Sequence, residues 1–535
     1  MKNFLKYFFL FFILLKSVNV FSLNKLLSFQ VNDTLYILPV VVHVIHTGTP
    51  VGSPDNPTDS TIAAMINNLN KTWRKNGTLY GGADMKIQFQ LAKRSPSCQS
   101  STGIVRVNGS VVPNYISGGI TNYNNPASAD EIAVKNLSRW PNTDYINIWI
   151  VNKINGNSNV PGGYTYFPEL NSARTDGLVL NASVVDGTNK TIAHEMGHFF
   201  YLYHTFADGA NETTCAANAD CITQGDLICD TEPCLLQTIC TNNNNTCTGT
   251  IYLVTDVAHN YTVLNNYMGY TDCQWMFTDG QKVRARSALF TYRSSLISSQ
   301  ALTLPTGVTT TAACIPTAAF GTSSFYGVQK VDFNTLHVYS NTSAADNIFY
   351  VDRTCNQLTM LMKGQSYLLT VTGSYLNPHN LKAFIDFNND GDFNDAGENI
   401  LNDLNGTSTV NVTIPTLGVP VFTPLRMRIV ADNPNGAVAN ACQLFGTASE
   451  GAGQIEDYGL IIIPRKIYSV ASGGWNIPAT WSCNCVPQND DEVNIKTSHT
   501  ISITTAMGTQ QCGKLILDAG STFNDGYNLN IIGNY

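Results

Sequence analysis

Two histidines four residues apart, His194 and His198, constrain this chain more than any other feature of its sequence. Residues at that spacing share one face of an α-helix, so both imidazoles can reach one metal ion. A third histidine, His204, follows six residues later, beyond the reach of that face. The helix must therefore end in a sharp turn near Tyr201. Three histidine ligands leave the fourth position of Zn²⁺ open for water, which marks a catalytic rather than a structural site.

Glu195 lies between the two helical histidines and supplies the acid–base chemistry that such a centre needs. Its carboxylate can deprotonate a zinc-bound water, whose pKa the metal lowers to about 7, and can pass the proton to a leaving amine. The alternative is a helix that carries histidines on its surface. Only nine histidines occur in the chain, and three stand in this register, which favours a zinc hydrolase.

The first residues indicate export. Lys2 and Lys6 precede an unbroken apolar run at residues 7–15, which predicts a signal peptide over 1–22 and a short pro-segment or linker over 23–34. A short membrane anchor is the alternative, but the run is too short for a typical span, and no later stretch of about 20 apolar residues exists. The mature protein is therefore expected to be secreted, without a membrane span.

The charge of the chain excludes one class of partner. Charged residues make up 13% of the sequence and the net charge is -8, so no basic field is available for nucleic acid.

Fourteen cysteines in an exported chain predict disulfides. Eight lie up to Cys273 and six from Cys314 onward, and these even counts permit bridges within each half. A cysteine metal cluster is the alternative, but no tidy pair of CxxC elements occurs.

Residues 35–300 combine strand and helix patterns, which predicts an α/β or α+β catalytic domain. The expected strands are 35–47, 85–93 and 145–152, with an extended segment at 162–168, and the expected helices are 59–73, 191–202 and 279–298. Beyond a linker at 301–312 the pattern changes to short strands and turns, which predicts all-β modules. Residues 313–465 are expected to form a β-sandwich, and residues 466–535 a β-solenoid-like module that could be incomplete.

A resemblance sharpens this interpretation. The segment HEMGHFFYLYH at 194–204 resembles the long metzincin motif HExxHxxGxxH, and NYMGY at 266–270 resembles its Met-turn. The words HTF at 204–206, GDLICDTEPC at 225–234 and YMGYTDCQWMFTDGQ at 267–281 are similar to those of the pappalysin family, which includes pappalysin and ulilysin. The resemblance covers about residues 35–298. It implies a metzincin-like fold and hydrolysis of internal peptide bonds in proteins.

The same resemblance implies roles for further residues. Met268 would form an apolar floor under the metal, and Tyr270 would stabilise the tetrahedral intermediate; ordinary core packing is the alternative for both. An extended substrate would pair with an edge strand near residues 163–167. The family also binds calcium and carries a disulfide-linked loop between the third histidine and the Met-turn. The matching residues are Asp226, Asp230 and Thr231 for calcium, and Cys229 and Cys273 as disulfide candidates.

Two features depart from the family pattern. Tyr201 stands where the motif has Gly, and a bulky residue with positive φ costs about 1–2 kcal/mol. Either the turn is built differently or strain is stored there. Since all ligands are present, activity is still expected. The short pro-segment contains no Cys, so a cysteine switch is not expected.

The downstream segments at 384–398 and 453–461 resemble the GEVED domain of secreted bacterial proteins. The first is also rich in hard oxygen ligands and could bind calcium, although Gly397 occupies the place of the final EF-hand Glu. An Asx-rich hairpin is the alternative. The candidate ligands are Asp386, Asn388, Asp390 and Asp392. Residues 468–483 resemble β-rich repeats of exported proteins from Bacteroidetes-like bacteria, which implies attachment to a cell surface or a glycan.

Two rival functions remain from the sequence. One is a non-catalytic adhesion or glycan-binding protein whose protease-like domain is inert, which the β modules and Tyr201 favour. The intact set of three histidines and Glu195 opposes it. The other is a zinc hydrolase that acts on non-peptide substrates, which the ligands alone permit.

Overall fold

The computed structural model describes a large part of the chain. It covers residues 34–75, 82–122, 125–168, 174–207, 214–217, 219–240, 244–251, 263–305, 307, 309–311, 313–315, 327–339, 349–373, 380–403, 407–432, 441–442, 453–526 and 529–532. The predicted signal peptide (1–22) and all but Thr34 of the predicted pro-segment (23–34) lie outside these residues. Two compact units are present, Met1–Ser95 with Ser101–Ile297, and Pro96–Ser100 with Ser298–Tyr535. No helix among the described residues is long and apolar enough to span a bilayer.

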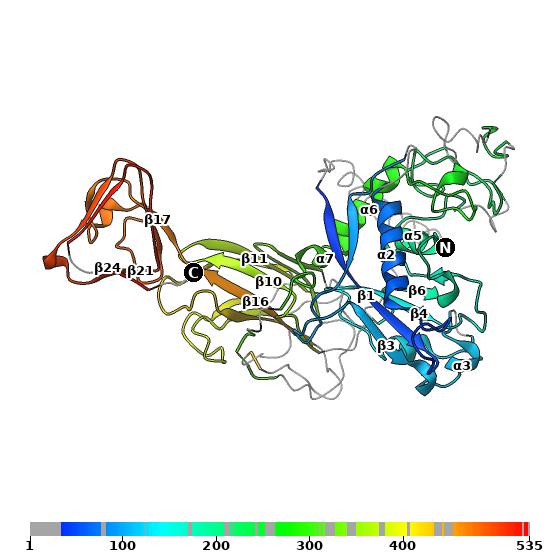
Figure 1. Ribbon diagram of the computed structural model, residues 1–535, viewed down its shortest axis with the longest axis horizontal. Helices are drawn as coiled ribbons and strands as arrows, with labels where there is room; N and C mark the ends of the chain where they lie inside the picture. Colours follow the sequence, from blue (N-terminus) through cyan, green and yellow to red (C-terminus); the bar gives the residue numbers. More distant parts are fainter. Residues whose placement is uncertain are drawn as a thin grey trace, which may run out of the picture. The chain divides into compact units, whose positions relative to one another are not determined.

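A six-stranded sheet forms the framework of the first unit (Figure 1). β1 (Tyr36–His46) pairs in parallel with β2 (Ile87–Leu91), β3 (Ile104–Asn108) and β4 (Ile146–Val151). β6 (Leu178–Asn181) continues the parallel order beside β4, and β5 (Gly163–Tyr164) forms the edge, antiparallel to β6. The predicted strands are confirmed, although only two residues of the extended segment 162–168 pair as a strand. β1 is buried along most of its length, as expected for a β-branched run in a parallel sheet.

Capping side chains define where two of the helices begin. α2 (Asp59–Trp73) is capped by the Thr58 hydroxyl, which accepts from the Thr61 amide at 3.2 Å. α5 (Thr191–Phe199) carries the histidines, and α6 (Asp279–Tyr292) begins with a Thr278–Gln281 capping box. The helix predicted over 279–298 is broken, since α6 ends at Tyr292 and the short α7 (Ser295–Ser298) follows. The remaining short helices are η1 (Gly109–Val111), α3 (Tyr115–Gly118), α4 (Glu131–Lys135), η2 (Ala182–Val184) and η4 (Val263–Asn265).

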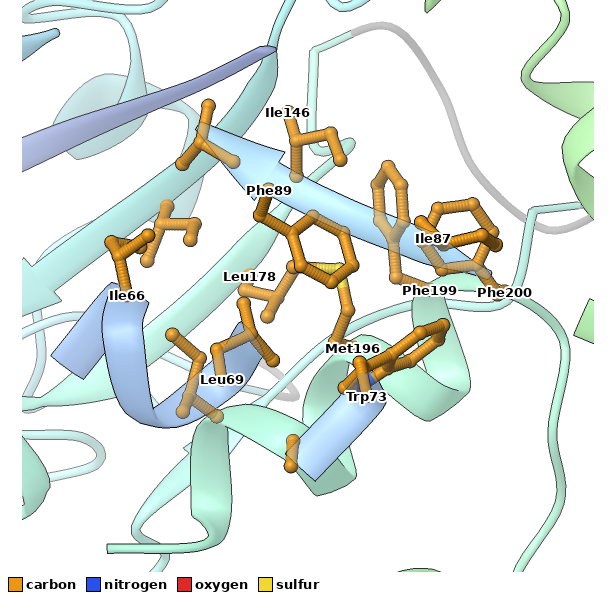
Figure 2. Close-up of a cluster of buried hydrophobic side chains, with 14 of the residues drawn as sticks. Ile66, Leu69, Trp73, Ile87, Phe89, Ile146, Leu178, Met196, Phe199 and Phe200 are labelled. Carbon is orange, nitrogen blue, oxygen red and sulfur yellow. The ribbon is translucent and has the colours of Figure 1, made fainter. Parts of the chain in front are cut away.

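The main core orients α5. Met196, Phe199 and Phe200 point into an apolar cluster that also contains Trp73 of α2 and Phe89 of β2 (Figure 2). The Trp73 ring lies 5.3 Å from that of Phe89 and 5.4 Å from that of Phe200. Large aromatic side chains bury much apolar area, so this cluster fixes the rotation of α5 about its axis. His194 and His198, which lie four residues apart on α5, are thereby placed on another face of the helix.

His43 is a buried histidine of β1 with a structural role. Its Nε2 donates to Asn147 Oδ1 at 2.9 Å, and its ring stacks on Trp149 at 5.2 Å. The second ring nitrogen, Nδ1, has no hydrogen-bond partner. Burial lowers the pKa of His43 from 6.5 to about 4, because the charged imidazolium would be desolvated there.

The buried, neutral His43 predicts that the folded protein loses stability in acid. The unfolded chain takes up the proton near pH 6.5 and the folded chain only near pH 4, so the stability contribution is complete above pH 6.5 and is lost as the pH falls to 4. The expected loss is about 3 kcal/mol. In His43→Gln, calorimetry should find a smaller fall in Tm between pH 6.5 and 4. Identical slopes for wild type and His43→Gln would contradict this account.

The second unit contains a β-sandwich. One sheet has the order β10-β16-β15-β12-β13, with β9 also paired to β16, and the other has the order β14-β11-β7-β8. Their interior is one apolar cluster that draws on both sheets. The strands are β7 (Val328–Phe333), β8 (Leu336–Tyr339), β9 (Tyr350–Asp352), β10 (Leu358–Met362), β11 (Ser366–Gly373), β12 (Asn380–Ile385), β13 (Asn399–Asp403), β14 (Thr407–Thr413), β15 (Pro424–Asp432) and β16 (Gly453–Ile463).

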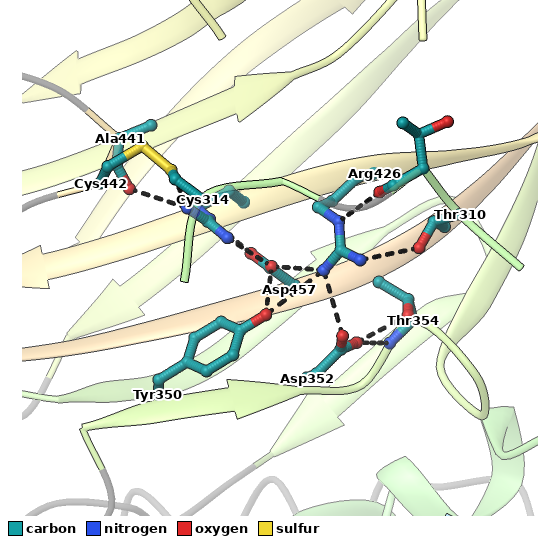
Figure 3. A network of polar contacts seen from close by, with 11 residues as sticks. Thr310, Cys314, Tyr350, Asp352, Thr354, Arg426, Ala441, Cys442 and Asp457 are labelled. Carbon is teal, nitrogen blue, oxygen red and sulfur yellow. Dashed lines mark hydrogen bonds and ion pairs between the residues drawn. A yellow bond between two sulfur atoms is a disulfide. The ribbon is translucent and has the colours of Figure 1, made fainter. Parts of the chain in front are cut away.

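A buried ionic network joins neighbouring strands of this sandwich (Figure 3). Asp457 of β16 accepts from Arg426 Nη1 at 2.6 Å and from Arg428 Nη2 at 2.7 Å, both on β15. Arg426 also donates to the hydroxyl of Thr310, at 2.9 Å, so the end of the predicted linker is attached to the sandwich. Removal of one partner would leave a buried charge unpaired, which is strongly destabilising.

The last strands pair in parallel ladders, β17-β19-β22, β18-β20-β23 and β21-β24. Successive passes of the chain therefore stack on one another, which is the architecture of a small β-solenoid. The strands are β17 (Lys466–Tyr468), β18 (Gly473–Gly474), β19 (Glu492–Ile495), β20 (Thr500–Ile503), β21 (Gln510–Cys512), β22 (Lys514–Leu517), β23 (Thr522–Asp525) and β24 (Leu529–Ile531), with η5 (Pro478–Thr480) and η6 (Thr505–Met507) between them.

Twelve cysteines form disulfides, and the two others, Cys234 and Cys512, are buried thiols. The pairs are Cys98–Cys355, Cys215–Cys247, Cys221–Cys229, Cys240–Cys273, Cys314–Cys442 and Cys483–Cys485. Cys229 and Cys273 are both bridged, but not to each other. The expectation of bridges within each half of the sequence fails for Cys98, because Pro96–Ser100 clusters with the second unit.

Candidate metal centre and active site

The turn after α5 is a Schellman motif. The Tyr201 amide donates to the His198 carbonyl and the Leu202 amide to the Gly197 carbonyl, both at 2.9 Å. Tyr201 adopts φ 69°, the left-handed conformation for which the related motif uses Gly. The turn is therefore built in the usual way, and a non-glycine residue bears the backbone strain. This geometry also explains why α5 ends at Phe199 and not at the expected residue 202.

The turn brings the three histidines together. Their Nε2 atoms lie 3.1 Å apart between His194 and His198, 3.2 Å between His194 and His204, and 3.0 Å between His198 and His204. Zinc–nitrogen bonds of 2.0–2.1 Å in a tetrahedral site require ligand nitrogens about 3.3 Å apart. The residues present therefore fit one zinc ion with an open fourth position.

The opposite ring nitrogens determine which atoms face the metal position. His194 Nδ1 lies 2.8 Å from the Tyr267 carbonyl, and His198 Nδ1 lies 2.7 Å from the Leu202 carbonyl. A carbonyl can only accept, so both Nδ1 atoms carry the proton and both Nε2 lone pairs are free to coordinate. Burial lowers the pKa of His194 to about 4 and of His204 to about 3, and holds the pKa of His198 well below 6.5. All three are therefore neutral at pH 7, as metal ligands must be.

Glu195 is buried beside this centre and close to the edge strand. Desolvation raises its pKa from 4.5 to about 8. A Cβ added at Gly163 of β5 would lie 3.1 Å from Glu195 Cγ and 2.8 Å from the Val179 carbonyl oxygen. Gly163 therefore permits a close approach between the edge strand and the carboxylate.

The Met-turn packs directly beneath the helix. Met268 is fully buried, and a Cβ added at Gly197 would lie 2.3 Å from its sulfur. The turn is held by Asn266, whose Oδ1 accepts from the Met268 amide at 2.9 Å and whose Nδ2 donates to Gln281 Oε1 at 2.8 Å. Gln281 also belongs to the capping box of α6, so the start of that helix supports the floor of the metal centre.

Tyr270 lies at the open side of the centre. Its side chain is 47% exposed, and its hydroxyl lies 3.1 Å from His204 Nε2. A phenol at this position can donate a hydrogen bond to an oxygen that accumulates negative charge beside the histidines.

The calcium candidates after the third histidine are only partly gathered. Asp226 is buried and accepts from the Thr231 hydroxyl at 2.7 Å, whereas Asp230 is exposed and accepts from the Gly280 amide at 2.7 Å. Desolvation raises the pKa of Asp226 to about 7. Within the described residues, the groups whose potential ligand atoms all lie within 4.8 Å of one another are the three histidines and Cys240, Asp272 and Cys273, the last containing a disulfide.

The candidates of the sandwich form a loop between β12 and β13. Asp386 accepts from the amides of Asp390 and Gly391, at 3.1 and 3.0 Å. Asn388 donates to Asp390 Oδ2 at 3.0 Å, and Asp392 Oδ1 accepts from the Asn394 amide at 2.8 Å. Backbone donors therefore occupy several of the carboxylates.

Sequence patterns did not reveal several groups that shape the site. Tyr267 and Leu202 contribute backbone carbonyls. Every residue type has such a carbonyl, so the sequence does not indicate these roles. Asn266 and Gln281 stood within motif words but without an assigned role. Arg284 of α6, whose Nε donates to the Tyr201 carbonyl at 2.6 Å, had no signal at all.

Comparisons with known proteins agree with this geometry. Residues 128–290 match the Peptidase_M43 family, described as pregnancy-associated plasma protein-A, and residues 380–461 match the GEVED domain. An extracellular metalloprotease of Arthroderma otae is 28% identical over 265 residues, which cover 47% of this chain and 77% of the relative. Another from Pyricularia oryzae is 33% identical over 153 residues, which cover 26% of this chain and 47% of the relative. A solved structure, mirolysin in complex with compound 9, covers 51% of this chain and 99% of its own, with 24% identity and a TM-score of 0.39.

The two family matches confirm the protease family and the GEVED domain predicted from the motifs. The six disulfides among the described residues and the names of the relatives confirm the predicted extracellular location. The match over residues 128–290 spans the three converging histidines. The chain is therefore an extracellular metalloprotease that carries a Peptidase_M43, or pappalysin, domain and a C-terminal GEVED domain.

Proposed function

We propose that this protein is a zinc-dependent endopeptidase that hydrolyses internal peptide bonds of proteins outside the cell. His194, His198 and His204 hold the zinc ion. The observation that carries the proposal is the convergence of three Nε2 atoms within 3.2 Å of one another. The protonated Nδ1 atoms of His194 and His198 face backbone carbonyls.

The residues around the ion divide the reaction between them. When bound, zinc activates a water molecule and polarises the scissile carbonyl. Glu195 takes the proton from the attacking water and passes it to the leaving nitrogen. Tyr270 donates its phenolic proton in a hydrogen bond to the developing oxyanion. Met268 supports the helix from below.

The edge strand supplies a place for substrate. β5 pairs with β6 on one side, and no strand among the described residues pairs with its other side, where an extended peptide could add. Gly163 lies against Glu195. A peptide paired with this strand would therefore run past the carboxylate.

Activity, metal content and chelation test the proposal together. The purified mature protein should contain one zinc ion per chain and cleave denatured casein; a chelator should stop cleavage, and added zinc should restore it. A protein that holds one zinc ion but cleaves nothing, even after its first residues are trimmed, would favour the adhesion or glycan-binding alternative.

We also propose two weaker calcium sites, at Asp226, Asp230 and Thr231 and at Asp386, Asn388, Asp390 and Asp392. Burial raises the pKa of Asp226 and of Asp386 above the usual range, so a bound cation would relieve the cost of their ionisation.

The proposed domains are 35–300 for the protease, 313–465 for the sandwich and 466–535 for the solenoid-like module. The last two would attach the enzyme to a cell surface or a glycan.

Asp226→Asn tests the first calcium site. Without calcium, the folded carboxyl keeps its proton up to about pH 7, whereas the unfolded one releases it near 3.8. The contribution of Asp226 to the free energy of unfolding should therefore be most favourable below pH 3.8 and fall as the pH rises to 7. In calcium-free, zinc-loaded protein at pH 8, the variant should have the higher Tm. Added calcium should raise the Tm of wild type more than that of the variant, which keeps the second proposed site; equal responses of the two proteins would exclude the site at Asp226.

A further inference from the structure

The segment between the second and third histidines is held by a residue from another helix. Arg284 of α6 donates from Nε to the Tyr201 carbonyl at 2.6 Å. Its guanidinium carbon lies 4.4 Å from the centre of the Tyr201 ring and 4.9 Å from that of Tyr203. One side chain therefore binds the backbone of the strained residue and the faces of two rings in the same turn.

Other aromatic rings enclose the turn. The Tyr201 ring lies 5.8 Å from Tyr292 of α6, 5.9 Å from Phe167 and 5.5 Å from Tyr203. Phe167 in turn lies 5.4 Å from the ring of His198. A glycine at position 201 could make none of these side-chain contacts. The residue that strains the backbone is thus also the residue that anchors the turn.

A shift of the turn would reach two metal ligands. The Leu202 carbonyl holds His198 Nδ1 at 2.7 Å, and Leu202 directly follows Tyr201. His204 lies three residues after Tyr201, and its Nε2 position depends on the path of the chain through Tyr203. His194, by contrast, is oriented by the Tyr267 carbonyl of the Met-turn.

We propose that Arg284 and Tyr201 form a positioning pair that offsets the left-handed backbone at Tyr201 and holds His198 and His204 in place for zinc. The inference rests on the proposed zinc site. Arg284 does not touch the metal position; it acts through the turn. In this chain the positioning pair takes the place of the glycine that the motif otherwise uses.

The test measures how fast zinc leaves the full-length protein. Zinc release into a chromophoric chelator would be followed for wild type, Arg284→Ala, Arg284→Lys, Tyr201→Gly and the double variant Tyr201→Gly/Arg284→Ala. Lys71→Ala removes an exposed cation from α2 and serves as the matched control. The Tm of each metal-free protein is recorded separately, so that a general loss of stability is recognised.

Arg284→Ala should release zinc at least 10-fold faster than wild type, and Arg284→Lys should recover only part of this loss, because an ammonium cannot reproduce the planar stack. The effect of Arg284→Ala should shrink in the Tyr201→Gly background, where no strain needs to be offset. If Arg284→Ala does not fold, Arg284→Lys still gives a release rate, and a wild-type rate in this variant would overturn the proposal.

Unchanged zinc release in Arg284→Ala, or an equal effect of this substitution in both backgrounds, would also overturn it. A lower Tm of the metal-free protein without faster zinc release would assign Arg284 a merely structural role. The zinc content of wild type separates the two hypotheses. If wild type binds one zinc ion per chain and Arg284→Ala releases it at the wild-type rate, only the positioning pair is overturned. If wild type binds no zinc, the proposed function is overturned.

Discussion

Glu195→Gln is expected to lower kcat/KM on a protein substrate by about 10⁴-fold while the protein still binds one zinc ion. The amide keeps the size of the side chain but cannot take a proton from water. Glu195 is buried and does not belong to the histidine set, so its replacement leaves the three Nε2 atoms in place. Metal analysis and initial rates on casein would measure both halves of this expectation.

Glu232→Gln is the matched control. Glu232 accepts from the Thr248 hydroxyl at 2.8 Å in the cysteine-rich segment, outside the metal centre. This variant should keep wild-type kcat/KM. Activity of Glu195→Gln within 10-fold of wild type would contradict the role of Glu195 as the proton carrier, even if zinc binding were intact.

Gly197→Ala is expected to lower activity by about 100-fold and to weaken zinc binding. The added methyl group would lie 2.3 Å from the sulfur of Met268, which is fully buried and cannot swing into solvent. Either Met268 leaves its place or α5 moves away from the Met-turn, whose Tyr267 carbonyl orients His194. Overpacking of this kind costs about 1–3 kcal/mol in stability. Calorimetry, chelator competition and initial rates would measure the three effects.

The double variant Gly197→Ala/Met268→Ala separates the clash from other effects of the methyl group. Removal of the sulfur makes room at this contact, so the double variant should bind zinc more tightly than Gly197→Ala alone. If the loss of zinc affinity in the double variant equals the sum of the losses in the two single variants, the contact between Gly197 and Met268 does not cause the effect of Gly197→Ala. The close packing of α5 against the Met-turn would then have no special role.

At Tyr201 the sequence offered backbone strain as one of two alternatives and did not reveal the residue that offsets it. The sequence showed that the sharp turn falls on a residue other than Gly, and the structure has φ 69° there. Arg284 lies 83 residues away in sequence. Its place on α6 follows no pattern shared with the histidine motif, so no local rule could have paired the two.

The sequence by itself determined the chemistry of the centre. Helical periodicity places His194 and His198 on one face and Met196 and Phe199 on another, so the residue spacing alone distinguishes the metal ligands of α5 from its core-facing residues. The strands β1, β2 and β4 also follow from local patterns, since they are rich in β-branched and aromatic residues, and the buried residues of α2 recur at helical spacing.

Only the tertiary structure decided what orients that chemistry. The acceptors of the two Nδ1 protons are backbone carbonyls, which every residue type carries, so their identity depends on where the chain passes. The pairing of Cys229 with Cys221 and of Cys273 with Cys240 depends on the path of an irregular segment. Periodicity reports which face of an element is buried, whereas contacts between distant segments arise from packing and leave no local signal.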